Sequence, residues 1–162
     1  MKDIKTNAMR ILDRMKINYT VNTYQCDQFV DGVAVADMLG QPYDRSFKTL
    51  VTRGHSGEIR VFVLPIAEEL DMKAAAKSVG EKSVDMLHVK EINAITGYIR
   101  GGCTAIGMKK RYSTVLDSSA AAHDIIIVSG GRIGSQIMLA PDDFIRAVDG
   151  KYADITVKRQ KM

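Results

Sequence analysis

The spacing of apolar residues in the first quarter of the chain changes from a helical period to an extended one and back. In residues 6–15 the apolar side chains fall on one helical face, so the chain is expected to open with a helix. Residues 19–24 alternate from side to side, which is typical of a strand. Residues 31–39 return to the helical period, and Gly40 is placed to end that helix.

The centre of the chain carries the pattern of a hairpin. Residues 46–53 and 59–64 are rich in β-forming residues, and the Gly-His-Ser-Gly turn at residues 54–57 separates them. We therefore expect these two strands to pair antiparallel. A helix is predicted over residues 70–79, because apolar residues lie near helical spacing there and Gly80 follows as a C-cap.

Shorter elements are predicted in the second half of the chain. Residues 89–95 fit a short helix, whereas residues 125–128 form a continuous apolar run that indicates a buried strand. Residues 136–139 predict another short strand. A last helix is expected to begin at Pro141 and to stop near Gly150, since proline is favoured in the first turn and two aspartates follow it.

These elements together indicate the fold class. Helices and strands are interspersed, but hairpin connections outnumber β-α-β units, so the expected fold is α+β with a mixed sheet. The chain has 162 residues, which is a common length for one domain, and no repeat or linker divides it. One domain over residues 1–162 is therefore expected.

Composition bears on the compartment. The first twenty residues carry charges throughout, and no later run reaches membrane-spanning length, so neither a secretory signal nor a membrane partner is expected. Cys26 and Cys103 are far apart and form no C-x-x-C pair, which fits a reducing compartment better than a disulfide scaffold. We expect a cytoplasmic protein.

The net charge of +4 is modest but unevenly placed. Basic residues are consecutive at positions 109–111 and crowd the C-terminus at positions 158, 159 and 161. Such runs can attract phosphate, although solvated basic faces are common on small proteins. With no tryptophan and few aromatic residues, a long base-stacking platform is not expected.

Familiar catalytic signatures are missing from the sequence. It contains no P-loop, no G-x-G-x-x-G opening a helix after a strand and no H-E-x-x-H. His55, His88 and His123 are far apart and fall near predicted turns or element ends, where ordinary surface histidines are common. We therefore expect neither a metal site nor a cofactor.

Lys48 is the first candidate for chemistry. It lies within the predicted strand 46–53, where alternation places Phe47 and Thr49 on one face and Lys48 on the other. A lysine at that position can point into a cleft and hold a phosphate or an ester as a fixed cation. A solvated strand lysine would show the same pattern, so the pattern alone leaves both readings open.

Two glycine-rich segments are the next candidates. Residues 96–110 combine four glycines with a basic end, and residues 129–134 (Ser-Gly-Gly-Arg-Ile-Gly) repeat the glycine pattern. Glycine lets the backbone approach a ligand closely and present N–H groups to carbonyl or phosphate oxygen. Plain turns between strands would have the same composition.

Together these segments carry a family resemblance. The helix at the start, the Ser-Phe-Lys-Thr-Leu-Val strand at 46–51, the Leu-Asp-Met-Lys-Ala-Ala-Ala-Lys stretch at 70–77, the 96–110 loop and the Val-Ser-Gly-Gly segment at 128–131 stand in the order and spacing of one family. The chain resembles the YbaK/EbsC family of prolyl-tRNA editing proteins over nearly its whole length. The resemblance implies a mixed, largely antiparallel, barrel-like sheet with surrounding helices.

The resemblance also implies an activity and partners. The implied reaction is deacylation of tRNA(Pro) that has been mischarged with cysteine, with Cys-tRNA(Cys) as a further substrate. A synthetase pocket built for proline cannot reject a near-isostere by binding alone, so a second site must clear the error. The implied partners are aminoacylated tRNA(Pro) and, transiently, prolyl-tRNA synthetase, with no DNA among them.

In the family, the thiol of the substrate is thought to attack the ester carbonyl and expel the tRNA, so the enzyme supplies no nucleophile. A site of this kind needs positioning groups and hydrogen-bond donors for the developing oxyanion. By resemblance, Lys48 is the catalytic candidate that holds the terminal adenosine or its phosphate. The residues implied to bind the substrate are Tyr24, Phe29, Thr49, Tyr98, Gly101, Gly102, Ser129 and Gly130.

The sequence departs from the family pattern at two positions. Ala105 stands where relatives commonly carry proline, and Gln136 stands where relatives carry a carboxylate that could partner Lys48. Two alternatives therefore stay open: a deacylase for Ala-tRNA(Pro) or another small amino acid, and a catalytically inert module that binds tRNA or a synthetase. Cys103 could in principle attack an ester, but no histidine is placed by sequence to activate it, so both cysteines are interpreted as structural.

Overall fold

The structure is a computed structural model that describes residues 5–26 and 30–158 of the chain. Its main sheet has five strands in the order β4-β2-β3-β5-β8. The hairpin of β2 (Phe47–Gly54) and β3 (Ile59–Pro65) pairs antiparallel, as the sequence predicts. The pairs β3–β5 and β5–β8 are parallel, so this sheet is mixed. The remaining bounds are β4 (Val84–Met86), β5 (Ser113–Asp117) and β8 (Lys151–Ala153).

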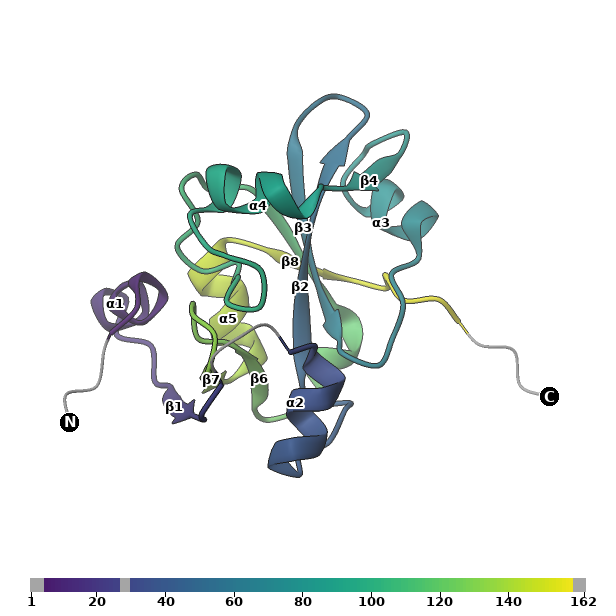
Figure 1. Cartoon of the computed structure of the whole chain (residues 1–162). Helices are drawn as coiled ribbons and strands as arrows, with labels where there is room; N and C mark the ends of the chain where they lie inside the picture. The colour runs from purple at the N-terminus through teal and green to yellow at the C-terminus, as the bar shows by residue number, and fades with distance from the viewer. Residues whose placement is uncertain (1–4, 27–29, 159–162) are drawn as a thin grey trace.

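A second sheet of three antiparallel strands lies beside the first in the order β1-β7-β6 (Figure 1). Its strands are β1 (Thr20–Thr23), β6 (Ile126–Ser129) and β7 (Ser135–Leu139). A bridge between Ser46 and Ile127 joins the start of β2 to β6. The mixed α+β class is thus observed, but the strands of the described residues form two sheets and no closed barrel, so the barrel-like sheet is not confirmed.

The predicted helices form, with caps that explain where they begin and end. The side chain of Thr6 accepts a hydrogen bond from the Met9 N–H at 3.3 Å and caps α1. Asp31 caps the next helix in the same way, and Gly40 ends it with a left-handed φ of 68°. The helices are α1 (Asn7–Arg14), α2 (Gly32–Leu39), α3 (Met72–Ser78), α4 (Val89–Thr96) and α5 (Pro141–Val148).

The core lies on both faces of the main sheet. Alternate residues of β3 belong to two apolar clusters: Val61 and Val63 face a cluster shared with α1 and α5, and Phe62 and Leu64 face a smaller one beneath α3. Burial on both faces explains why β3 reads as a nearly continuous apolar run. Among the described residues, none of the helices combines the length with the apolar composition that a membrane span requires.

The sequence analysis missed three strands and a short helix. Strands β4, β5 and β8 were not predicted, nor was the 3₁₀ helix Ser118–Ala122. Strand β5 carried a usable signal, because its Ser-Thr-Val-Leu sequence is rich in β-formers. The two three-residue strands are too short to show a period, and their pairing with β2 and β5 alone defines them.

Candidate functional site

A cavity of about 390 Å³ opens between α2, β2 and α4. That volume lies within the range of small-molecule sites, roughly 300–1,000 Å³. In Figure 1, α4 and α2 lie toward opposite ends of the long strand β2. Five of the nine residues that the sequence predicts for the site line this cavity: Tyr24, Lys48, Thr49, Gly101 and Ser129.

The other four predicted residues have different positions. Tyr98, Gly102 and Gly130 are in the described part of the chain but are not among the residues that line the cavity. Phe29 lies outside the described residues. The structure therefore brings together Tyr24, which follows β1, with residues of β2 and of the two glycine-rich segments, which are far apart in sequence.

Lys48 is half-buried on β2 and lines both the cavity and a smaller hollow beside α2 that Asp31, Gly32 and Ile66 complete. Burial lowers the pKa of the Lys48 ammonium, while the carboxylates of Glu68 and Glu69 oppose that shift. Within the described residues, Lys48 makes no ion pair at 4.0 Å or less. A partly desolvated cation at the wall of a cavity can bind a phosphate or an ester oxygen more strongly than a surface lysine can.

Tyr98 stabilises the conformation of the 96–110 loop through two hydrogen bonds. Its hydroxyl donates to the carbonyl oxygen of Ile106 at 2.5 Å, and its N–H donates to Thr96 Oγ1 at 3.0 Å. Burial raises the pKa of Tyr98 to about 12, so the phenol stays protonated and keeps donating. Its contacts fit a support for the loop that carries Gly101.

The glycines of the two predicted segments allow close packing, Gly102 between the two loops and Gly130 within the β6–β7 turn. A Cβ on Gly102 would stand 2.7 Å from Arg132 Cα, and a Cβ on Gly130 would stand 2.3 Å from Ser135 Oγ. The N–H of Gly102 donates to the carbonyl of Ile99, and that of Gly130 donates to the carbonyl of Ser135. Both N–H groups therefore already donate to carbonyl oxygens of the protein. Gly101, with a φ of 87°, is the glycine of this pair of loops that reaches the cavity wall.

Sequence reasoning did not predict several polar residues of the wall, among them Ser135 and Gln41. Ser135 is 3% exposed, lines the cavity, and its Oγ has no hydrogen-bond partner among the described residues. Gln41 also lines the cavity and bonds to Gln136. A buried hydroxyl without a partner is costly, so Ser135 is placed to bind a ligand atom. Neither residue belongs to a motif, since each reaches the site only through the fold.

Cys103 lines the cavity as well, which its place in the glycine-rich loop had suggested. Burial raises the pKa of its thiol to about 11, with a weaker opposing effect from Thr96. Thiolate, and not thiol, is the nucleophile, so Cys103 is a poor nucleophile near neutral pH. This environment agrees with the interpretation of Cys103 as a packing residue.

The remaining candidates for acid-base or metal chemistry lie elsewhere. None of the three histidines lines the cavity, and His55 and His88 are exposed. Across residues 5–26 and 30–158 there is no group of three or more His, Cys, Asp or Glu side chains that could hold a metal ion. In that part of the chain, the cavity is lined by two cations, Lys48 and Arg100, by the carboxylate of Asp31, and by amides, hydroxyls and backbone groups. No histidine lies there beside a nucleophile.

Comparison with known proteins gives the relatives of this chain. The family model described as Aminoacyl-tRNA editing domain matches residues 29–147. A protein of Enterococcus faecalis (strain ATCC 700802 / V583), described as a candidate Cys-tRNA(Pro)/Cys-tRNA(Cys) deacylase, EbsC, is 44% identical over 155 residues, which are 95% of this chain and 94% of that protein.

Two solved structures share the fold. One is a hypothetical protein, with a TM-score of 0.85 and 18% identity over 94% of this chain and 100% of that one. The other is a candidate trans-editing enzyme for prolyl tRNA synthetase, with a TM-score of 0.81 and 18% identity over 96% of this chain and 100% of that one. At such identities the likeness concerns the fold alone.

Proposed function

Because the chain belongs to the aminoacyl-tRNA editing domain family, we propose that it is a trans-editing deacylase that clears Cys-tRNA(Pro), with Cys-tRNA(Cys) as a further substrate. The family assignment confirms the resemblance read from the sequence motifs. The choice of cysteine as the acyl group is supported by the name of the 44% identical relative. We expect the protein in the cytoplasm as a single domain, because aminoacylated tRNA is made and used there.

One observation supports the proposed mechanism. The cavity is lined by a half-buried lysine and many hydrogen-bonding groups, but the thiol of Cys103, its only candidate nucleophile among the described cysteines, is poorly ionised. Cys103 has its pKa raised to about 11, and no histidine of the described residues lines the wall beside it. A protein nucleophile is therefore poorly supported. A substrate that carries its own thiol needs only to be held in the reactive geometry, which can accelerate an intramolecular attack by many orders of magnitude.

In the proposed reaction the cysteine thiol of the substrate attacks its own ester carbonyl. A bond forms between sulfur and the carbonyl carbon, the bond from that carbon to the ribose oxygen breaks, and the thiol proton ends on the released ribose hydroxyl. The products are a cyclic thioester of cysteine and free tRNA. The atoms of the substrate are all accounted for in these two products, so the reaction requires neither water nor a protein nucleophile.

We assign Lys48 the central role in this reaction. Its ammonium binds the terminal phosphate or the ribose oxygens, and it stabilises negative charge as the ester oxygen leaves. Gly101 contributes backbone at the wall of the cavity, and Ser129 and Ser135 contribute hydroxyls. Tyr24 and Thr49 line the remaining wall as substrate-binding residues, and we keep Phe29 in that role as a proposal from the family resemblance.

Transfer RNA selection is proposed to come largely from outside the chain. The cavity has room for an acyl group and nearby atoms, and the sequence contains no dedicated RNA-binding domain. A transient complex with prolyl-tRNA synthetase would bring tRNA(Pro) to the site. The expected behaviour is weak discrimination among tRNAs by the isolated protein and stronger discrimination when the synthetase is present.

The test is the rate of deacylation of Cys-tRNA(Pro), Ala-tRNA(Pro) and Cys-tRNA(Cys) by the wild-type protein, by Lys48→Ala and by Lys48→Arg. We expect rapid loss of cysteine from tRNA(Pro), and a fall in kcat/KM of about 100-fold or more for Lys48→Ala, as when one group that stabilises the reacting oxygen is removed. Lys73→Ala is the matched control, since Lys73 is exposed on α3 and does not line the cavity.

The mechanism has its own test in S-methylcysteinyl-tRNA(Pro), whose blocked sulfur cannot attack. We expect no acceleration on this substrate. Equal rates for the methylated and free-thiol substrates would replace the thiol mechanism with hydrolysis by water. Faster clearance of alanine than of cysteine would assign the enzyme to Ala-tRNA(Pro), and binding of tRNA without any deacylation would identify an inert binding module.

A further inference from the structure

The mouth of the cavity has two rims of opposite charge. One, the α4 rim, is the segment 89–112, which contains five Lys or Arg residues and one carboxylate. The other, the α2 rim, is the segment 31–45, which contains three aspartates and one arginine. Both rims reach the cavity, through Val89 and Ile92 on one side and Gly32 and Val35 on the other.

The single carboxylate of the α4 rim does not offset its positive charge. Glu91 pairs with Arg53 of β2 at 3.3 Å, so a cation from outside the rim already balances it. Lys90 and Lys110 are exposed, and Lys109 lies over α4, where its ammonium donates to the carbonyl of Ala94 at 3.0 Å. Arg111 in turn pairs with Asp149, outside the rim, at 4.0 Å. The α4 rim therefore presents a net positive surface that depends chiefly on its lysines and continues to the edge of the cavity.

Exposed apolar side chains lie among these cations. Val89 is 54% exposed, Ile99 is 53% exposed, and Met86, immediately before the rim, is 47% exposed. Val89 and Met86 also line the cavity. Interleaved cations and apolar groups match the alternation of phosphates with ribose and base faces along a polynucleotide.

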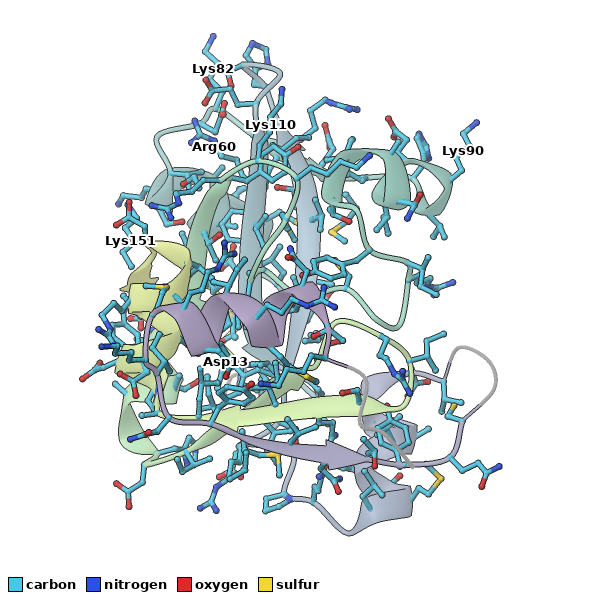
Figure 2. All side chains as sticks on the ribbon, turned by 90° about the vertical axis from the view of Figure 1, so that its left-hand side faces the viewer. Asp13, Arg60, Lys82, Lys90, Lys110 and Lys151 are labelled. Carbon is cyan, nitrogen blue, oxygen red and sulfur yellow. The ribbon has the colours of Figure 1, made fainter. Side chains whose placement is uncertain are left out.

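The two rims lie toward different ends of the molecule. Figure 2 shows Lys90 and Lys110 toward the same upper end of the molecule. In Figure 1, α4 lies at that upper end and α2 at the lower end, so the two rims are separated along the length of β2. A polyanion whose end enters the cavity meets attraction on the α4 side and repulsion on the α2 side.

We propose that the α4 rim binds the sugar-phosphate backbone of the tRNA acceptor end, and that the RNA leaves the cavity over α4 and away from α2. This inference rests on the proposed function, since it takes an aminoacylated RNA as the ligand. It adds the direction of the RNA and the residues that contact it outside the cavity. Lys90 and Lys110 are the phosphate-binding residues, and the exposed Val89 and Ile99 of the same rim are the apolar contacts.

The test compares two double charge reversals with the same change in net charge. The first, Lys90→Glu/Lys110→Glu, alters the α4 rim. The second, Lys73→Glu/Lys77→Glu, alters exposed lysines of α3, which contributes nothing to the lining of the cavity. Both leave the cavity residues unchanged, and thermal melting followed by circular dichroism checks that both variants are folded.

Binding is measured by fluorescence anisotropy with a labelled acceptor-stem hairpin that ends in CCA and carries no amino acid. The measurement is repeated at several salt concentrations. We expect the α4 variant to bind at least 10-fold more weakly than wild type, and the α3 variant to change by less than about 3-fold. The dependence of log Kd on log salt should flatten by roughly 1.4 for two lost phosphate contacts to single-stranded RNA. Equal weakening of both variants, or wild-type binding by the α4 variant, would overturn the proposal.

Deacylation of cysteinyl-adenosine separates this proposal from the proposed function. This short ester reaches the cavity but has no backbone for the α4 rim, so the α4 variant should cleave it at the wild-type rate while losing activity on Cys-tRNA(Pro). A 10-fold loss on the short ester as well would overturn the surface assignment. If wild type cleaves neither substrate but the α4 variant still loses hairpin binding selectively, the RNA surface stands and the editing function fails.

Discussion

Gln41 and Gln136 exchange two amide hydrogen bonds at the wall of the cavity. Gln41 Nε2 donates to Gln136 Oε1 at 2.8 Å, and Gln136 Nε2 donates to Gln41 Oε1 at 3.0 Å. Asn22 Nδ2 adds a third bond to Gln136 Oε1 at 3.1 Å. The family resemblance places a carboxylate at position 136, but here the position is neutral and its oxygen already accepts two donors. This wall therefore contributes no negative charge toward Lys48.

The first prediction concerns this amide pair. Gln41→Ala and Gln136→Ala should each lower the free energy of unfolding by about 1–2 kcal/mol, because each removes both bonds of the pair at a half-buried or buried position. In Gln41→Ala, the Gln136 amide keeps only the bond from Asn22. The double variant should lose less than the sum, with a coupling of about 0.5 kcal/mol or more. Urea unfolding of the four proteins measures the cycle. Strict additivity would show that the two amides act independently, and exposed Gln25→Ala serves as control.

The second prediction concerns Cys103. With a pKa of about 11, about one thiol in a thousand is ionised at pH 8, so alkylation of Cys103 by iodoacetamide should be slow in the native protein and fast after unfolding. A Cys26→Ser background assigns the label to Cys103 by mass spectrometry. Cys103→Ala should keep kcat/KM for Cys-tRNA(Pro) within about 5-fold of wild type, a loss from packing only. A 100-fold loss would instead make Cys103 the nucleophile.

The third prediction follows from the lowered pKa of Lys48. The folded protein disfavours the protonated form, so the charge costs stability at neutral pH, and this cost disappears as pH rises through the folded pKa toward the unfolded value. Lys48→Met should therefore raise Tm at pH 7, and its advantage over wild type should shrink toward pH 10. Exposed Lys73→Met is the control. A constant difference between Lys48→Met and wild type from pH 7 to 10 would argue against a lowered pKa.

The fourth prediction concerns Glu81, which ties the α3–β4 connection to the turn of the β2–β3 hairpin. Its carboxylate accepts from the Ser56 hydroxyl at 2.6 Å, from the Ser56 N–H at 3.0 Å and from Arg60 Nε at 2.9 Å. These bonds, chiefly those from Ser56, lower the pKa of Glu81 to about 2. A lowered carboxyl pKa adds stability that is complete above the ordinary pKa of 4.5 and is lost as pH falls toward 2.

The measurement is Tm between pH 2 and pH 6 for wild type, Glu81→Gln and Glu58→Gln. Glu81→Gln should lower Tm at pH 6 and lose that deficit toward pH 2, because wild-type Glu81 is then protonated too. Glu58 also contacts Arg60, but its side chain is 70% exposed, and such surface pairs contribute little. Parallel curves for wild type and Glu81→Gln would contradict the lowered pKa.

Local patterns in the sequence predicted the elements that are long enough to show a period. The hairpin of β2 and β3 follows from β-forming runs around a glycine turn, and α1, α2 and α5 follow from apolar spacing with a polar or proline start and a definite end. Strands β4 and β8 could not be found in this way, because three residues show no period and their pairing is decided by distant strands. Strand β5 was overlooked despite a usable β-rich signal.

The residues of the site also fall into two groups, those that local sequence patterns indicated and those that only the fold brings to the cavity. Local patterns made Lys48 and the two glycine-rich segments candidates, because a cation within a strand and clustered glycines are visible locally. The family resemblance then implied the role of Lys48. Gln41 and Ser135 belong to no motif, and only folding brings them to the cavity. Likewise, only the fold shows that Gly102 is needed for the contact of its loop with Arg132, and that Gly130 is needed for the close approach to Ser135 within the β6–β7 turn.

By itself, the sequence determined the mixed α+β class and the family, because each depends on residue types at short or fixed spacing. It also led to the proposal of Lys48 as the central residue. The tertiary structure decided which predicted residues share one cavity, which N–H groups are already used, and how charge is divided between the α4 and α2 rims. These properties depend on distances between segments up to about a hundred residues apart. Such distances arise from sheet pairing and burial of the core, which no local pattern encodes.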